Sequence, residues 1–208
     1  MLKHLSYNRG FMNIRISLKV LLKQLPILTL LALATVSYGQ VKWLTFEEAE
    51  ARIKVEPRKI FVDVMTEWCT WCKKMDVNTF EQEEIAKFLN EAYYPVRFDA
   101  EQKEEIFFNG KSYKYGKIGK RMYNELAIEM MKGLTEDKVE MGFPSIVFLD
   151  EEMNVLQSIQ GYRGPKEFSK IASYFAGDFH KSVPWRSYSQ SYNEQEELDY
   201  SRIIKNKQ

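Results

Sequence analysis

The chain has 208 residues, 45% hydrophobic and 14% aromatic, which suits one domain of ordinary size with a real core. The formal net charge is +1, but five of the 30 Lys and Arg residues lie in 1–39, where there is no acid. The remaining 25 bases face 29 acids, a balance of −4. This argues against nucleic acid as a partner, because a nucleic-acid-binding protein needs a basic face.

The first 39 residues have the organisation of a secretory signal peptide. A basic segment precedes the apolar run 25–36 (LPILTLLALATV), and small residues follow it. The run has about 12 residues, fewer than the roughly 20 that cross a bilayer. We therefore predict cleavage before Gln40 and an exported protein, periplasmic or otherwise extracytoplasmic, without stable membrane insertion. An uncleaved anchor and a buried helix are the alternatives, and Met12 is an alternative start.

Two short elements are predicted between this segment and residue 58. Residues 41–43 form a candidate first strand. Thr45 and Glu48 have the spacing of a capping box, in which each side chain binds the other residue's backbone N–H. Apolar residues at helical spacing then predict a helix over 46–55, which Pro57 ends.

The only two cysteines, Cys69 and Cys72, lie three residues apart in Trp68-Cys69-Thr70-Trp71-Cys72. A strand-like apolar run at 59–65 leads into them, and a helix-compatible run at 72–77 leads out. A disulfide closing so short a loop restrains little unfolded chain and stabilises little. The spacing of the pair is therefore better explained by a chemical role of the cysteines than by a structural disulfide.

The spacing of the cysteines suits disulfide exchange. At a helix N-terminus, Cys69 would face unpaired N–H groups and the positive end of the dipole, which favour the thiolate. Cys72, one turn further on, would lie on the same helix face and could resolve the mixed disulfide. We predict Cys69 as the attacking thiol and Cys72 as the resolving thiol.

Asp63 lies six residues before Cys69, inside the apolar strand. A buried acid is costly without a partner or a task, so we predict that Asp63 accepts a proton from Cys72, directly or through water. The alternative is an exposed residue on an uncovered face of the sheet.

The cysteines fit other sites less well. Haem attachment requires a His directly after the second Cys, where this chain has Lys73. A structural zinc site needs four ligands, and after residue 39 the chain has two Cys and only His180. We therefore predict no metal and no cofactor other than the cysteine pair itself.

After the cysteines, a helix is predicted from Thr79, followed by a strand over 93–99. Residues 100–142 are less regular and read as an insertion, either an ordinary surface segment or one that faces the substrate. Within it, Asn109-Gly110 between aromatic runs predicts a hairpin, and apolar spacing predicts a helix over about 119–132 that Gly133 ends.

The last part of the chain predicts a buried strand at 145–149, an antiparallel return at 155–159 and a helix that begins at Pro165. Residues 178–208 are predicted to form a polar C-terminal tail, loosely held over 187–208. The folded domain is thus expected over 40–177. Pro144 stands at a strand start, where local sequence favours a trans bond, although a cis bond would let its backbone pair with an incoming peptide.

Taken together, these residues resemble the thioredoxin superfamily. Residues 61–63 followed by 67–73 look like that family's strand, buried acid and active-site helix, and residues 143–150 look like its cis-proline loop and next strand. The resemblance covers about 41–176 and implies an α/β thioredoxin fold, a central mixed sheet flanked by helices, with the insertion before the cis-proline loop. It implies a cis Phe143–Pro144 bond and is nearest to exported bacterial thiol-disulfide oxidoreductases.

The resemblance implies that protein thiols and disulfides are the substrates and that an external thiol-disulfide donor or acceptor resets the pair. Candidate substrate contacts are Trp68, Trp71, Phe143 and Pro144. Thr70-Trp71 replaces the Gly-Pro dipeptide of ordinary thioredoxins, which leaves the direction of electron flow open. A reductase is the prediction; an oxidase or isomerase, or a redox-inert binding module, is the alternative.

Overall fold

The computed structural model describes residues 39–118, 120–132, 141–193 and 198. The apolar run at 25–36 lies outside these residues, so signal cleavage and export stay predictions. Gly133, the predicted helix end, also lies outside them. Within the described part of the chain, no helix has the length and apolar character needed to cross a membrane.

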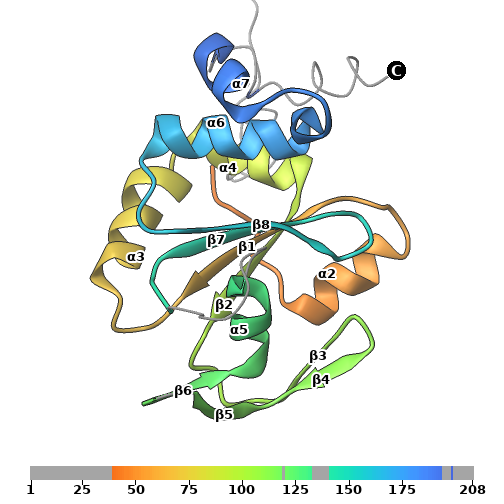
Figure 1. The fold of residues 1–208 in the computed structure, drawn as a ribbon, viewed down its shortest axis with the longest axis vertical. Coiled ribbons are helices and arrows are strands. Elements are labelled where there is room, and N and C mark those ends of the chain that lie inside the picture. The colour runs from red at the N-terminus through yellow and green to blue at the C-terminus, as the bar shows by residue number, and fades with distance from the viewer. Residues whose placement is uncertain (1–38, 119, 133–140, 194–197, 199–208) are drawn as a thin grey trace, which may run out of the picture. The chain divides into compact units, whose positions relative to one another are not determined.

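A four-stranded mixed sheet forms the centre of the domain, in the order β2-β1-β7-β8 (Figure 1). β1 (Ile60–Met65) pairs parallel with β2 (Tyr94–Asp99) on one side and antiparallel with β7 (Ser145–Leu149) on the other. β8 (Val155–Gln160) returns antiparallel to β7. The predicted strands at 93–99, 145–149 and 155–159 are confirmed, with boundaries that differ by one residue at most.

Helices cover both faces of this sheet (Figure 1). On one face lie α4 (Glu83–Ala92) and α6 (Pro165–Ala176), and on the other lie α2 (Phe46–Ile53) and α5 (Glu125–Met131). The predicted start of α6 at Pro165 is confirmed.

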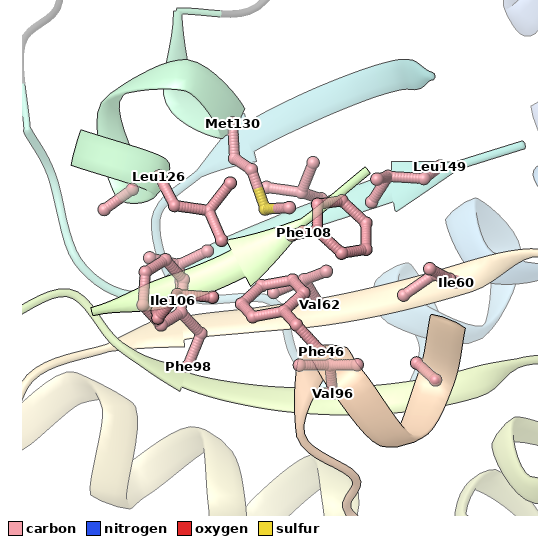
Figure 2. Close-up of a cluster of buried hydrophobic side chains, with 14 of the residues drawn as sticks. Phe46, Ile60, Val62, Val96, Phe98, Ile106, Phe108, Leu126, Met130 and Leu149 are labelled. Atoms are coloured by element: carbon pink, nitrogen blue, oxygen red, sulfur yellow. The ribbon is translucent and has the colours of Figure 1, made fainter. Parts of the chain in front are cut away.

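Side chains of β1 alternate between the two faces and so join two separate apolar clusters. Phe61 packs with residues of α4 and α6. Ile60 and Val62 point into the opposite cluster, together with Phe46 of α2 and Met130 of α5 (Figure 2). β1 is therefore the buried centre of the domain and a rigid support for the turn at its carboxyl end.

The segment before β1 confirms one prediction and contradicts another. Thr45 and Glu48 form the predicted capping box, and α2 runs to Ile53 rather than to residue 55. Residues 41–43 do not form a strand, because only Leu44 makes an isolated parallel bridge, with Val96. A single bridge fixes the chain at the edge of the sheet without adding a strand.

The segment after the cysteines begins its long helix later than predicted. A π-helix, η1 (Asp76–Phe80), follows α3 (Thr70–Met75), and α4 starts at Glu83 instead of Thr79. The apolar stripe of α4 is buried as expected, at Ile85, Phe88, Leu89 and Ala92.

The insertion contains two hairpins instead of one. β3 (Ile106–Phe108) and β4 (Lys111–Tyr113) flank Asn109 and Gly110, whose φ values of 50° and 73° are those of the predicted tight turn. The first half of the predicted helix over 119–132 is wrong: β5 (Tyr115–Ile118) and β6 (Arg121–Asn124) form a second hairpin there. Asn124 then caps α5 through its side chain, so the helix begins six residues late.

The tail is more ordered at its start than predicted. A short 3-10 helix, η2 (Phe179–Lys181), and α7 (Trp185–Ser191) follow α6. Tyr188 of α7 is buried in the cluster that contains Tyr174 and Phe175 of α6. Aromatic residues that look isolated in a polar sequence thus hold residues 179–191 onto the domain.

Candidate active site

The two cysteines lie at the carboxyl end of β1, where the chain enters α3. Cys69 is the N-cap residue of α3 and Cys72 lies in its first turn. A disulfide joins them, and the backbone N–H of Cys72 donates to Cys69 Sγ at 3.0 Å. This is the predicted placement, and the hydrogen bond is one that also stabilises a thiolate at Cys69.

The local sequence explains this geometry. β1 ends at Met65, and the N–H of Cys69 closes a turn onto the carbonyl oxygen of Thr66 at 3.0 Å. Lys73 and Lys74 occupy the last turn of α3, where cations favour the helix dipole. Both cysteines are about 4% exposed or less, so only a small part of the pair is accessible to a substrate.

Asp63 lies on β1 with its side chain on the face that Phe61 shares with α4 and α6, and it is 2% exposed. Burial raises the pKa of its carboxyl from 3.8 to about 7, against the lowering effect of the Arg97 guanidinium and with a contribution from the Asp76 charge. The alternative of an exposed strand residue is thus wrong. An acid whose pKa is raised this far toward neutral pH can exchange a proton there.

Arg97 and Asp76 are parts of the site that the sequence did not reveal. The β1–β2 register sets Arg97 opposite Asp63, with its guanidinium 3.4 Å from Asp63 Oδ2. Asp76, in η1, accepts a hydrogen bond from the same Arg97 nitrogen. The ring centroid of Trp43 lies 4.3 Å from the guanidinium carbon. Arg97 is therefore shared between two carboxylates, and Asp63 Oδ1 has no hydrogen-bond partner among the described residues.

The bond between Phe143 and Pro144 is cis, as the resemblance implied. The Pro144 carbonyl accepts from the N–H of Gly161 at 2.8 Å, which ties the loop to the end of β8. The Phe143 ring lies 6.0 Å from the ring of Trp68. The fold therefore brings the proline loop and the cysteine helix together.

Two exposed indole rings border the cysteines, as 52% of Trp68 and 54% of Trp71 is exposed. Trp68 leans on Phe143, whereas Trp71 leans on Tyr162, with ring centroids 5.6 Å apart. Tyr162 was not among the predicted contacts, although it lies beside Gly161 in the loop before α6. Exposed aromatic rings beside a buried redox pair form a surface that an extended peptide can cover.

No metal site accompanies the pair in the part of the chain that the structure describes. No group of three or more His, Cys, Asp and Glu side chains there could hold an ion. His180 instead packs its ring against Tyr174 and Phe175 of α6.

Comparison with known proteins places this site in a family. The thioredoxin-like domain family matches residues 46–176, well over half of the chain, and the chain belongs to that family. The fold is therefore the thioredoxin fold that the sequence predicted. Oxidoreductases with this fold use their own cysteine pair and need no further cofactor.

Individual relatives are more distant. The chain is 34% identical to mouse spermatogenesis-associated protein 20 over 71 residues, which are 34% of this chain and 9% of that protein. A DsbH oxidoreductase is similar in structure with a TM-score of 0.42 and 18% identity, over 76% of this chain and 90% of that one. A thioredoxin from Thermus thermophilus gives 0.47 and 18%, over 65% and 87%. The chain thus spans about a tenth of the mouse relative.

Proposed function

We propose that this protein is an exported thiol-disulfide oxidoreductase that reduces protein disulfides. The observation that carries the proposal is the placement of the cysteine pair at the N-terminus of α3, directly after the strand that carries a buried acid with a pKa of about 7. A redox-inert binding module would have no use for an acid held at this cost of burial.

The reaction begins with the reduced protein. The Cys69 thiolate attacks one sulfur of a substrate disulfide, a mixed disulfide forms, and the other substrate sulfur leaves as a thiolate that takes up a proton. Cys72 then loses its proton to Asp63 and attacks Cys69 Sγ. The second substrate sulfur leaves as a thiolate and takes up a proton, which Asp63 can return. The substrate is then a dithiol, reduced by two electrons, and the protein keeps the Cys69–Cys72 disulfide. An external dithiol donor returns the two electrons.

Export rests on the sequence of the first 39 residues. A basic segment, an apolar run and small residues at the cleavage positions form a secretory signal, so the protein works outside the cytoplasm. Edman sequencing of protein recovered from the producing cells should begin at Gln40. Mature protein that retains the apolar run would contradict cleavage.

Insulin reduction with dithiothreitol as the donor tests the activity. Wild type should accelerate the precipitation of insulin chains, and Cys69→Ser should abolish the acceleration; equal rates would exclude catalysis by the pair. In the Cys72→Ala variant, substrates should stay disulfide-linked to Cys69. Linkage through Cys72 in the reciprocal Cys69→Ala variant would reverse the two roles.

The reduction potential of the pair decides the direction of electron flow. A value near about −270 mV, measured against a glutathione buffer, supports the reductase. A value near about −120 mV is that of an oxidant and would overturn the direction proposed.

A further inference from the structure

The insertion contains a concentration of positive charge that the overall balance hides. Residues 111–121 (KSYKYGKIGKR) include five cations and no acid, whereas the chain from residue 40 on carries four more acids than bases. Within this run lie β4, β5 and the first residue of β6. One edge of a negatively charged domain is thus strongly basic.

The cations at the free end of this hairpin are not neutralised by the described part of the chain. Lys114, at its base, lies 4.0 Å from a Glu105 carboxylate oxygen. Lys117, Lys120 and Arg121 are exposed, and no carboxylate of the described residues pairs with them. A run of cations on a protein surface is usually only solvated and has no specific function. The location of these cations relative to the redox site therefore decides whether they can act on a substrate.

Contacts of β6 fix the hairpin beside the redox site. The Arg121 guanidinium carbon lies 5.2 Å from the ring centroid of Trp68, the residue before Cys69. Tyr123 of β6 is buried, with its ring 5.9 Å from that of Phe143. The N–H of Asn124 donates to the Ala100 carbonyl oxygen at 2.8 Å. These contacts hold the basic strands beside Trp68 and the proline loop.

Acids beside Trp68 and at the base of the hairpin must be weighed against the cations. Glu101 accepts a hydrogen bond from the Trp68 indole N–H at 3.1 Å, and Asp99 accepts one from the Glu101 N–H at 2.9 Å. Glu67 is exposed. Glu101 and Asp99 are thus engaged in hydrogen bonds. The Glu125 carboxylate at the base of the hairpin also accepts one, from the Lys114 N–H at 3.0 Å, whereas Lys117 and Lys120 are exposed. A substrate that approaches over the hairpin meets the cations first.

We propose that the β5–β6 hairpin is a docking surface for acidic polypeptide segments that flank the disulfide to be reduced; this rests on the reductase activity proposed above. Cations next to a reactive site attract an anionic partner and raise its association rate, an effect that salt screens. The hairpin therefore selects among disulfides by the charge of their surroundings.

The test uses two synthetic peptides with one identical intramolecular disulfide, flanked by four Glu residues in one and by four Gln residues in the other. Wild-type protein should reduce the Glu peptide with a kcat/KM about tenfold higher at low salt, and 0.5 M NaCl should remove most of this preference. Lys117→Gln combined with Lys120→Gln should bring the ratio near one, and Lys117→Glu with Lys120→Glu should invert it. Arg121 stays in place, so the Trp68 contact is kept.

A matched control removes two exposed cations elsewhere. Lys87→Gln in α4 combined with Arg186→Gln in α7 makes the same change in net charge and should leave the peptide ratio unchanged. If the wild type reduces both peptides equally, the docking surface is excluded and the reductase stands; reduction of neither peptide excludes both. A hairpin that binds vesicles of anionic lipid while the peptide ratio stays at one would also overturn the proposal.

Discussion

Two charged side chains four residues apart are almost equally hidden from solvent, but their charged partners differ. Lys59, directly before β1, is 3% exposed and Asp63, within β1, is 2% exposed. Lys59 Nζ lies 2.7 Å from a Glu151 carboxylate oxygen and 2.9 Å from one of Asp178. Burial lowers the pKa of Lys59, but these two carboxylates outweigh it and the net change is upward. The charged form of Lys59 is therefore the stable one.

Asp63 has the reverse balance. It has one cation, Arg97, at 3.4 Å, and Asp76 draws on the same guanidinium. Burial outweighs this shared cation and raises the pKa to about 7. The comparison teaches that burial alone does not make a residue functional: a compensated charge fixes the fold, and an undercompensated acid is available for proton transfer.

Replacing Asp63 should give the largest effect. Because its folded-state pKa is raised, the stability linked to protonated Asp63 is fully present below about pH 4 and is lost as the pH rises through about 7. Asp63→Asn does not titrate, so its free energy of unfolding should exceed that of wild type by up to about 4 kcal/mol above pH 7 and by little below pH 4. Urea denaturation of the oxidised protein from pH 3.5 to pH 8.5 measures this.

The same variant should reduce disulfides about 100-fold more slowly, because it lacks the proton acceptor that we propose for Cys72. Stability and activity should thus change in opposite directions, which a merely structural residue would not produce. Glu47→Gln, which removes an exposed acid in α2, is the control and should change neither. Full activity in Asp63→Asn would assign Asp63 no part in proton transfer.

Replacing Lys59 should have the opposite signature. Lys59→Met leaves Glu151 and Asp178 without their shared cation and should lower the free energy of unfolding by about 2 kcal/mol, less than for a fully buried pair because both carboxylates reach solvent. The rate of insulin reduction per folded molecule should stay that of wild type. A large loss of activity with unchanged stability would contradict the structural role that we assign to Lys59.

Releasing Arg97 from its second carboxylate should give the smallest effect. Asp76→Asn removes a charge that raises the pKa of Asp63 and lets Arg97 pair with Asp63 alone. The acid limb of the pH–rate profile should move to lower pH, with reduction about threefold faster at pH 6 and unchanged at pH 8. Glu84→Gln, an exposed acid on α4, should leave the profile in place; movement to higher pH would contradict the sharing of Arg97.

Local signals in the sequence predicted much of the frame. The capping box at Thr45, the turn at Asn109-Gly110 and the proline at the start of α6 each act over a few residues, so the fold could not override them. The β5–β6 hairpin was missed because Met122 and Leu126 are four apart and fit a helical stripe. Gly119, at the first position of the predicted helix, was the contrary signal, since glycine is a poor helix former.

The residues that act on the pKa of Asp63 could not be found from any single segment of the sequence. Cys69, Cys72 and Asp63 belong to one continuous stretch, and their placement could be predicted from a strand followed by a helix. Arg97 reaches Asp63 through the register of two strands that are joined through α3, η1 and α4. Asp76 reaches Arg97 from the π-helix η1. Strand register and an irregular helix are set by packing across the sheet, which is why Arg97 and Asp76 were not foreseen.

The measurement that tests the central claim most directly is a ¹³C-detected NMR titration of the Asp63 side-chain carboxyl in the oxidised protein, with its resonance assigned from its absence in Asp63→Asn. The shared Arg97 and the burial of Asp63 predict a pKa of about 7. A pKa near 4 would show that Arg97 compensates Asp63 as fully as Glu151 and Asp178 compensate Lys59, and would contradict the assignment of Asp63 as the proton acceptor.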